Sequence, residues 1–355
     1  MSSISKHSGW KSVLLRHETI LLVVLVVEWL LFYHFGTSVN RRGMTVGFGT
    51  VDRQFDILRH SCEIGLLALA LTPVILTGGI DLSVGSLLGL SAIMFGKLWH
   101  DAGLPIGVAA GCAIGIGALA GGLNALLITT LRIPPLIVTL GTYSLFRGLA
   151  EAITHGAVTY TDFPASFLFL GQERWLGLPT QAWLFIAVAV LVWLLVHRTT
   201  FGRSFRAIGF APEGTRYAGI PVERRLAMVY VLAGIISALA AIIYTARLGQ
   251  AKADAGTGYE LFAITAVVLG GTSIFGGVGS VHGTLLGVAA IAVLKNGLAC
   301  LPVVMRMNSA EELSGMMTGA LLLLALCSSV LPKIFANWRA HKQTVRKQSQ
   351  QPTTT

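Results

Sequence analysis

The chain has 355 residues, of which 54% are hydrophobic and only 12% are charged, and its mean hydropathy is +0.73. Soluble domains carry about 25% charged residues, so this composition excludes an ordinary soluble protein and indicates a polytopic membrane protein. The net charge of +10 does not indicate nucleic-acid binding, because the basic residues gather beside apolar segments, where they act as topology signals.

Ten segments are apolar enough to cross a bilayer, for which about 20 residues suffice. We therefore expect an all-α transmembrane domain over 18–332. A cytoplasmic N-terminal segment, 1–17, would precede it, and a disordered cytoplasmic tail rich in Gln and Thr, 333–355, would follow. The expected spans are 18–36, 57–77, 83–99, 105–130, 134–154, 181–197, 226–247, 259–275, 281–300 and 312–332.

Basic residues cluster at the N-terminus, in the loop 198–225 and in the C-terminal tail. Short basic loops remain on the cytoplasmic side, and ten crossings place all three clusters there together. The opposing signal is the loop 37–56, expected outside, which carries Arg41, Arg42 and Arg53.

The loop 198–225 is longer than a turn requires and carries six arginines. Pro212 precedes and Gly219 follows the run from Glu213 to Ala218, a pattern typical of a short helix. Such a helix would let a membrane protein dock a soluble motor. The alternative is a solvated basic loop that only fixes topology.

Residues 76–86 read Leu-Thr-Gly-Gly-Ile-Asp-Leu-Ser-Val-Gly-Ser, and Asp81 is the only acid in a window of about thirty residues. An acid at the edge of a span is a candidate for a substrate or coupling role. It also fits a structural role, because Gly78 or Gly79 can end one helix in a left-handed cap while Asp81 or Ser83 caps the next.

The pieces Leu-x-Gly and Val-Gly-Ser recur in 268–284. Transporters are often built from internal repeats, but so short an echo also arises by chance in a chain with 41 glycines. The segment has no GxxxxGK[ST] pattern, so we expect no ATP site on this chain.

Small and polar residues inside the spans have structural explanations. Arg147 and Glu151 lie four residues apart on one expected helix, which predicts an ion pair within it. Glycines in the fourth span predict close helix packing; they are Gly111, Gly115, Gly117, Gly121 and Gly122.

Catalytic patterns are absent from the sequence: it has no HExxH, Ser/His/Asp set or acidic pair at helical spacing, so we do not expect an enzyme. The four cysteines show no CxxC spacing, so we predict neither a metal site nor a disulfide.

Taken together, several motifs resemble the permease subunits of bacterial ATP-binding-cassette sugar importers, the ribose, xylose, arabinose, galactose and rhamnose group. The resemblance covers roughly residues 57–330. It rests on Thr-Gly-Gly-Ile-Asp-Leu-Ser-Val-Gly-Ser (77–86), Gly122-x-Asn124, Arg-Ile-Pro-Pro-Leu-Ile-Val-Thr-Leu-Gly-Thr (132–142), Phe-Gly-Arg (201–203), Ala-Ile-Gly (207–209), Arg216-x-x-Gly219-Ile220, Gly-Thr-Gly-Tyr-Glu-Leu (256–261) and the Gly-rich run to Gly279.

The resemblance implies a type II importer-like permease of about ten helices in the bacterial inner membrane, with both termini cytoplasmic. It implies a second permease, identical or similar, two cassette ATPases and a periplasmic sugar-binding protein as partners. ATP and Mg would lie on the ATPases, leaving this chain without a cofactor. The expected cargo is a pentose, hexose or deoxyhexose. The alternatives are an autoinducer sugar, a polyol or a branched-chain amino acid on the same fold, or a stand-alone secondary transporter.

The resemblance also implies three groups of site residues. Those for ATPase coupling are Gly202, Arg203, Ala207, Gly209, Glu213, Arg216, Ala218, Gly219 and Ile220. Those for the translocation path or helix capping are Gly79, Asp81, Ser83, Asn124 and Thr139. Those for contact with the binding protein at the outer face are Arg247, Tyr259 and Glu260. Phe210-Ala211-Pro212 departs from the family, which usually has Asn here, and leaves the start of the coupling helix open.

Overall fold

The structure, a computed structural model, describes residues 17–39, 45–301, 313, 315–321 and 323–324. The described part is mostly helical, as predicted, with only four short strands. Its elements are α2 (His17–Phe35), β1 (Thr37–Val39), β2 (Thr45–Gly47), α3 (Val51–Leu76), α4 (Val84–His100), α5 (Ile106–Thr129), α6 (Pro135–Ile153), α7 (Ala165–Gln172), β3 (Arg174–Trp175), β4 (Leu178–Pro179), α8 (Thr180–Trp193), the π-helical turn η1 (Leu194–Arg198), α9 (Thr200–Phe210), α10 (Pro212–Tyr217), α11 (Val222–Leu248), α12 (Tyr259–Leu269) and α13 (Val281–Leu298).

Seven of the described helices are long and apolar enough to cross a membrane. The prediction of ten spans is therefore not confirmed. Two of the expected spans are too short to be counted among the seven. Helix α4 has 17 residues. Helix α12 has 11 residues in place of the 17 expected, because Gly270 and Gly271 end this helix early. The tenth expected span, 312–332, lies mostly outside the described residues.

Helix α3 forms the centre of the bundle, with 83% of its apolar window buried, whereas α2 lies at the edge with 11% buried. Helices α5 and α11 pack closely, because a side chain on Gly117 would strike the carbonyl oxygen of Gly234 and one on Gly121 would strike that of Tyr230. These two glycines confirm the predicted close packing. Gly111, Gly115 and Gly122 instead have open space, with no packing neighbour within 4 Å of the position that a methyl group would occupy.

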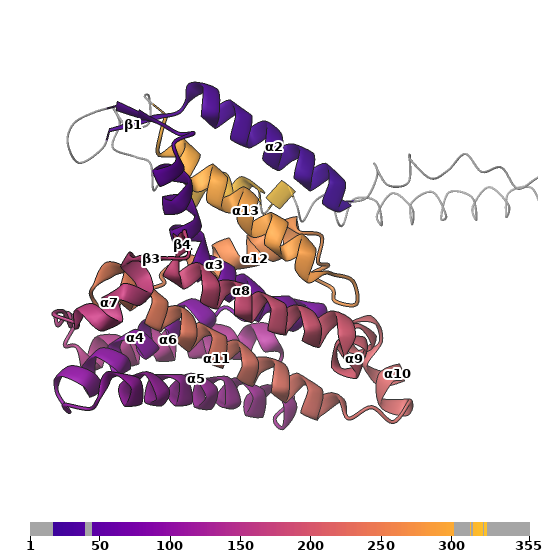
Figure 1. The fold of residues 1–355 in the computed structure, drawn as a ribbon. Helices are drawn as coiled ribbons and strands as arrows, with labels where there is room; N and C mark the ends of the chain where they lie inside the picture. The colour runs from indigo at the N-terminus through magenta and orange to yellow at the C-terminus, as the bar shows by residue number, and fades with distance from the viewer. Residues whose placement is uncertain (1–16, 40–44, 302–312, 314, 322, 325–355) are drawn as a thin grey trace, which may run out of the picture.

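The two ends of the bundle differ in character. Helices α9 and α10 lie together at one end, and α7, β3 and β4 lie at the other (Figure 1). The first residues of α2 and α13 meet at the α9 end, where the Ser280 hydroxyl donates to Glu18 over 2.7 Å. We call these the α9 end and the α7 end.

The loop expected over 155–180 is partly ordered into α7 and a short antiparallel pair, β3 and β4. The Tyr160 hydroxyl donates to Asp101 over 2.9 Å, and backbone bonds join Tyr160 to Ala251. Tyr160 is therefore buried within the α7 end. Of the three opposing arginines, Arg53 lies in α3 and contacts Cys300; Arg41 and Arg42 lie outside the described residues.

Candidate functional site

Helix α3 ends in a left-handed glycine cap at the α9 end of the bundle. Gly78 has φ +82°, and its amide donates to the Ile75 carbonyl over 2.9 Å. The Gly79 amide donates to Val74 over 3.0 Å. This pair of bonds is the Schellman arrangement, which needs a residue that tolerates positive φ. The glycines thus turn the chain out of α3 within two residues.

Asp81 organises the turn that follows. Its Oδ1 accepts from the backbone amide of Ser83 over 2.8 Å and from the Ser83 hydroxyl over 2.6 Å. Asp81 is buried, with 2% of its surface exposed. The carboxylate therefore fixes the entry into α4 rather than bonding to amides inside the first turn of that helix.

The turn is joined to α5 and α6 by buried side chains. Asn124 Nδ2 donates to the Ser83 hydroxyl over 2.8 Å, and the Thr142 hydroxyl donates to Asn124 Oδ1 over 2.7 Å. The Thr139 hydroxyl donates to the Ile80 carbonyl over 3.0 Å. We call Asp81, Ser83, Asn124, Thr139 and Thr142 the polar network.

The structure brings together all the residues that the sequence singled out for the path or for capping. It adds Thr142, which was not a candidate. The available signal was its spacing, since Thr139 and Thr142 are three apart and share one face of α6. The partners lie up to 59 residues apart in the chain, so the sequence could not pair them.

The basic loop folds into two short helices, α9 and α10. Thr199 caps α9 by accepting from the amide of Phe201 over 3.2 Å. Pro212 begins α10, and Gly219 with φ +79° follows its end. The predicted short helix, with proline at its start and glycine past its end, is confirmed.

The predicted coupling residues divide into two groups. Gly202 is buried, and a side chain there would strike the backbone of Val196, while Gly209 packs its backbone against Leu76 and Gly277. The remainder are exposed or half-buried. The exposed ones are Arg203, Glu213, Arg216, Ala218 and Gly219, and the half-buried ones are Ala207 and Ile220. Arg216 donates to Glu223 at the start of α11 over 2.5 Å.

The predicted outer-face contacts turn inward. Arg247 is 12% exposed and donates two hydrogen bonds to the fully buried Glu63, which also bonds to Tyr259. Arg247 still lines a polar hollow of about 670 Å³ at the α7 end, beside Arg59 and His60. The sequence analysis did not single out Glu63. The feature that could have identified it is a single acidic residue within an apolar run.

Glu260, also predicted as a contact for the binding protein, is turned inward as well, and that role stays a prediction. Glu260 is 6% exposed, and its carboxylate packs against Gly85 of α4. A side chain at position 85 would collide with that carboxylate. The predicted ion pair between Arg147 and Glu151 is wrong, because the Arg147 guanidinium donates to the carbonyls of Ala253 and Ala255. Gly89 leaves the space that admits the guanidinium.

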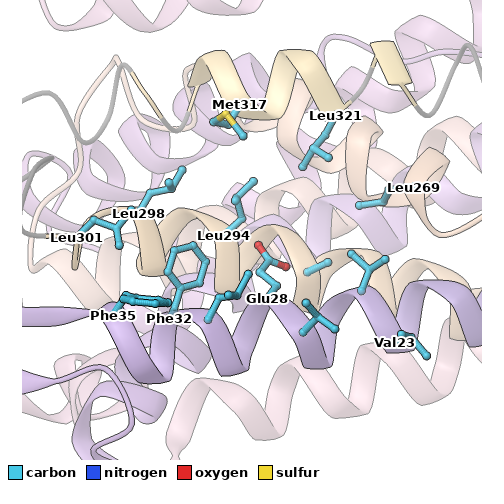
Figure 2. Close-up of a pocket in the computed structure, with 14 residues that line it drawn as sticks. Val23, Glu28, Phe32, Phe35, Leu269, Leu294, Leu298, Leu301, Met317 and Leu321 are labelled. Carbon is cyan, nitrogen blue, oxygen red and sulfur yellow. The ribbon is translucent and has the colours of Figure 1, made fainter.

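A second cavity, of about 640 Å³, lies between α2 and α13 (Figure 2). Its lining is apolar except for the Glu28 carboxylate, which points into it (Figure 2). A sugar carries many hydroxyl groups that need partners when buried, so this cavity does not suit a polar cargo. The part of the chain described here holds no group of three potential metal ligands.

Comparison with known proteins identifies the family of the chain. The family model described as "Branched-chain amino acid transport system / permease component" matches residues 54–326. An autoinducer 2 import system permease protein LsrD from Yersinia pseudotuberculosis serotype O:1b is 40% identical over 332 residues, 91% of this chain and 92% of that protein.

The LsrD protein of serotype O:3 is 39% identical with the same coverage. A solved structure, PsaBC from Streptococcus pneumoniae in complex with Fab, has a TM-score of 0.46 and 16% identity, covering 84% of this chain and 95% of that one. By the family match and the relatives together, this chain belongs to the family of branched-chain amino acid transport system permease components.

Proposed function

We propose that the chain is the transmembrane subunit of an ATP-driven importer for an autoinducer-2-like sugar derivative. The support for this cargo is the similarity to autoinducer 2 import permeases over 91% of the chain. A monosaccharide is the second candidate, favoured by the motif at 77–86. Transport of either would require a second permease, two cassette ATPases that hold ATP and Mg, and a periplasmic binding protein.

The observation that carries the proposal is the exposed surface of α9 and α10. Phe210 is 85% exposed and Tyr217 is 91% exposed, and both stand among arginines at one end of the bundle. Exposed aromatic residues with arginines are typical of protein interfaces. We infer that this surface, with Arg203 and Arg216, binds the cassette ATPase. We propose accordingly that the α9 end faces the cytoplasm of a bacterial inner membrane and that both termini lie on that side.

The mechanism follows from the position of this surface. ATP binding would bring the two ATPases together, and α9 and α10 would move with them. That movement would open the path between the two permeases alternately to the two sides. The polar network and the glycine cap at the end of α3 lie close to α9, so a movement of α9 would reach them.

Uptake by reconstituted vesicles tests the proposal. The chain would be combined with a second permease, a cassette ATPase and a periplasmic binding protein, and the uptake of autoinducer-2 and of ribose would be measured with and without ATP. We expect ATP-dependent uptake with a preference for autoinducer-2. Preference for ribose would select the second candidate. Uptake by the chain alone without ATP would indicate a secondary transporter and contradict the proposal.

Attachment of the ATPase tests the surface separately. We expect a double change, Phe210→Ser with Tyr217→Ser, to abolish co-purification of the ATPase, because both aromatic anchors are lost. Trp175→Ser is the matched control, since Trp175 is a 52% exposed aromatic residue at the α7 end. Equal attachment in both variants would contradict the proposed interface.

A further inference from the structure

Four glycines from three separate segments meet beside α9. They are Gly78 at the end of α3, Gly209 in α9, and Gly276 and Gly277 between α12 and α13. A methyl group at Gly209 would strike the carbonyl of Leu76 and the amide of Gly277. One at Gly276 would lie 2.8 Å from the Gly209 Cα and 2.8 Å from the Gly78 amide nitrogen. We call these four residues the glycine junction.

The segments of the junction are also bonded to each other. The Gly277 amide donates to the Leu76 carbonyl over 2.9 Å. Gly78, Gly276 and Gly277 all have φ between +80° and +82°, a conformation that other residues rarely adopt. Gly276 is therefore needed both for its backbone conformation and for the close approach. Gly78 and Gly277 are needed for their backbone conformation, and Gly209 for the close approach.

Contact between backbones differs mechanically from contact between side chains. A side chain can absorb a small displacement by rotating between its rotamers, whereas packed backbone has no such freedom. A shift of α9 must consequently displace both the α3–α4 turn and the α12–α13 loop. Three residues after Gly78 the chain reaches Asp81 and the polar network.

The α3–α4 turn and the α12–α13 loop begin in the same way, which supports a shared role. Helix α12 ends in the same arrangement as α3, with Gly271 at φ +88° donating to Val268 and Thr272 donating to Val267. The echo of Leu-x-Gly in the sequence thus corresponds to a repeated helix ending. The starts of the next helices differ, because Ser280 caps α13 directly, with its hydroxyl accepting from Gly283.

We infer that the glycine junction carries the movement of α9 into the membrane, and that Gly209 is its positioning residue. The α9 helix, the α3–α4 turn and the α12–α13 loop then move as one body. This inference rests on the proposed function. It adds to that function the point at which force from the ATPase enters the bundle.

The first test compares Gly209→Ala with Gly111→Ala in the reconstituted complex. Both changes add one methyl group to a helix, but the methyl group at Gly111 would have no neighbour within 4 Å. We expect Gly209→Ala to lower uptake more than about tenfold while the ATPase remains bound and hydrolyses ATP, and Gly111→Ala to change neither. A wild-type ratio of uptake to hydrolysis in Gly209→Ala would overturn the inference. Absence of ATP-dependent uptake in the unaltered complex would instead refute the proposed function.

A second test does not depend on the folding of Gly209→Ala. Cysteines replace Ala211 and Val278, both of which are exposed and flank the contact between Phe210 and Gly277, in a chain whose native cysteines are changed to alanine. A short bismaleimide then links them. Because the junction moves as one body, we expect linked complexes to retain the uptake of unlinked ones. Loss of uptake on linking, reversed by a cleavable linker, would show that α9 slides over the loop and would overturn the inference.

Discussion

Arg247 at the end of α11 donates two hydrogen bonds to Glu63 in α3, from Nε over 2.5 Å and from Nη2 over 3.0 Å. The two residues are 184 positions apart in the chain. Glu63 is fully buried, and Arg247 is 12% exposed. This ion pair joins the central helix α3 to α11, the longest of the described helices.

Removing one partner of this pair leaves the other charge buried. We expect Arg247→Ala to lower the free energy of unfolding by about 3–5 kcal/mol, measured by thermal unfolding in detergent. The double change Glu63→Leu with Arg247→Met should recover most of that loss, since no unpaired charge remains. A double variant as unstable as Arg247→Ala would show that the loss does not come from an unpaired buried charge on Glu63.

Asp81 uses only one carboxylate oxygen as acceptor for Ser83. An asparagine supplies the same acceptor, so we expect Asp81→Asn to keep both the stability and the uptake of the unaltered chain. Asp81→Ala loses both bonds and should cost about 1–2 kcal/mol. A transport defect in Asp81→Asn without a loss of stability would show that the charge itself acts in the path.

Tyr230 lies beside the α3–α4 turn, with its hydroxyl over Gly79. Within the described residues this hydroxyl is buried and makes no hydrogen bond. Burying a hydroxyl without a partner costs about 1–3 kcal/mol, so we expect Tyr230→Phe to be as stable as the unaltered chain or more so. A drop in uptake at unchanged stability would show that the hydroxyl forms a bond in another state of the transport cycle.

Arg216 contacts Glu223 within the chain over 2.5 Å, so its role at the ATPase interface can be separated from its role in holding α10 against α11. We expect Arg216→Glu to uncouple ATP hydrolysis from uptake. If Arg216 acts by binding the ATPase, exchange of the two residues, Arg216→Glu with Glu223→Arg, will not restore uptake. Full restoration would mean that the contact with Glu223 is what matters.

The Asp101–Tyr160 bond at the α7 end depends on pH. Contacts with His100 and Tyr160 lower the pKa of the Asp101 carboxyl below 3.8, and burial raises the pKa of Tyr160 to about 12. Because the folded-state pKa of Asp101 is the lower one, its contribution to stability is present above 3.8 and is lost as pH falls through the lowered value. We expect amide protection over 155–162 to be constant between about pH 5 and 9 and to fall in stronger acid. Tyr160→Phe, the control, should remove that dependence.

Local chemistry in the sequence determined the membrane class, the approximate positions of the described spans and the short helix after Pro212. Each depends on residues close together in the chain: an apolar run, a proline that begins a helix, or a glycine that ends one. The same reasoning placed the cap at Gly78. It failed for α12, where it carried the helix past Gly270 and Gly271.

Only the tertiary structure decided which distant groups meet. Arg147 faces Glu151 by helical spacing, but it binds Ala253 and Ala255 because Gly89 opens a route across α4. Thr142 joins the polar network, and Gly209 touches two other backbones, because the packing of several helices brings their partners within reach. Such contacts depend on the summed packing of the bundle, and no spacing within one segment records them.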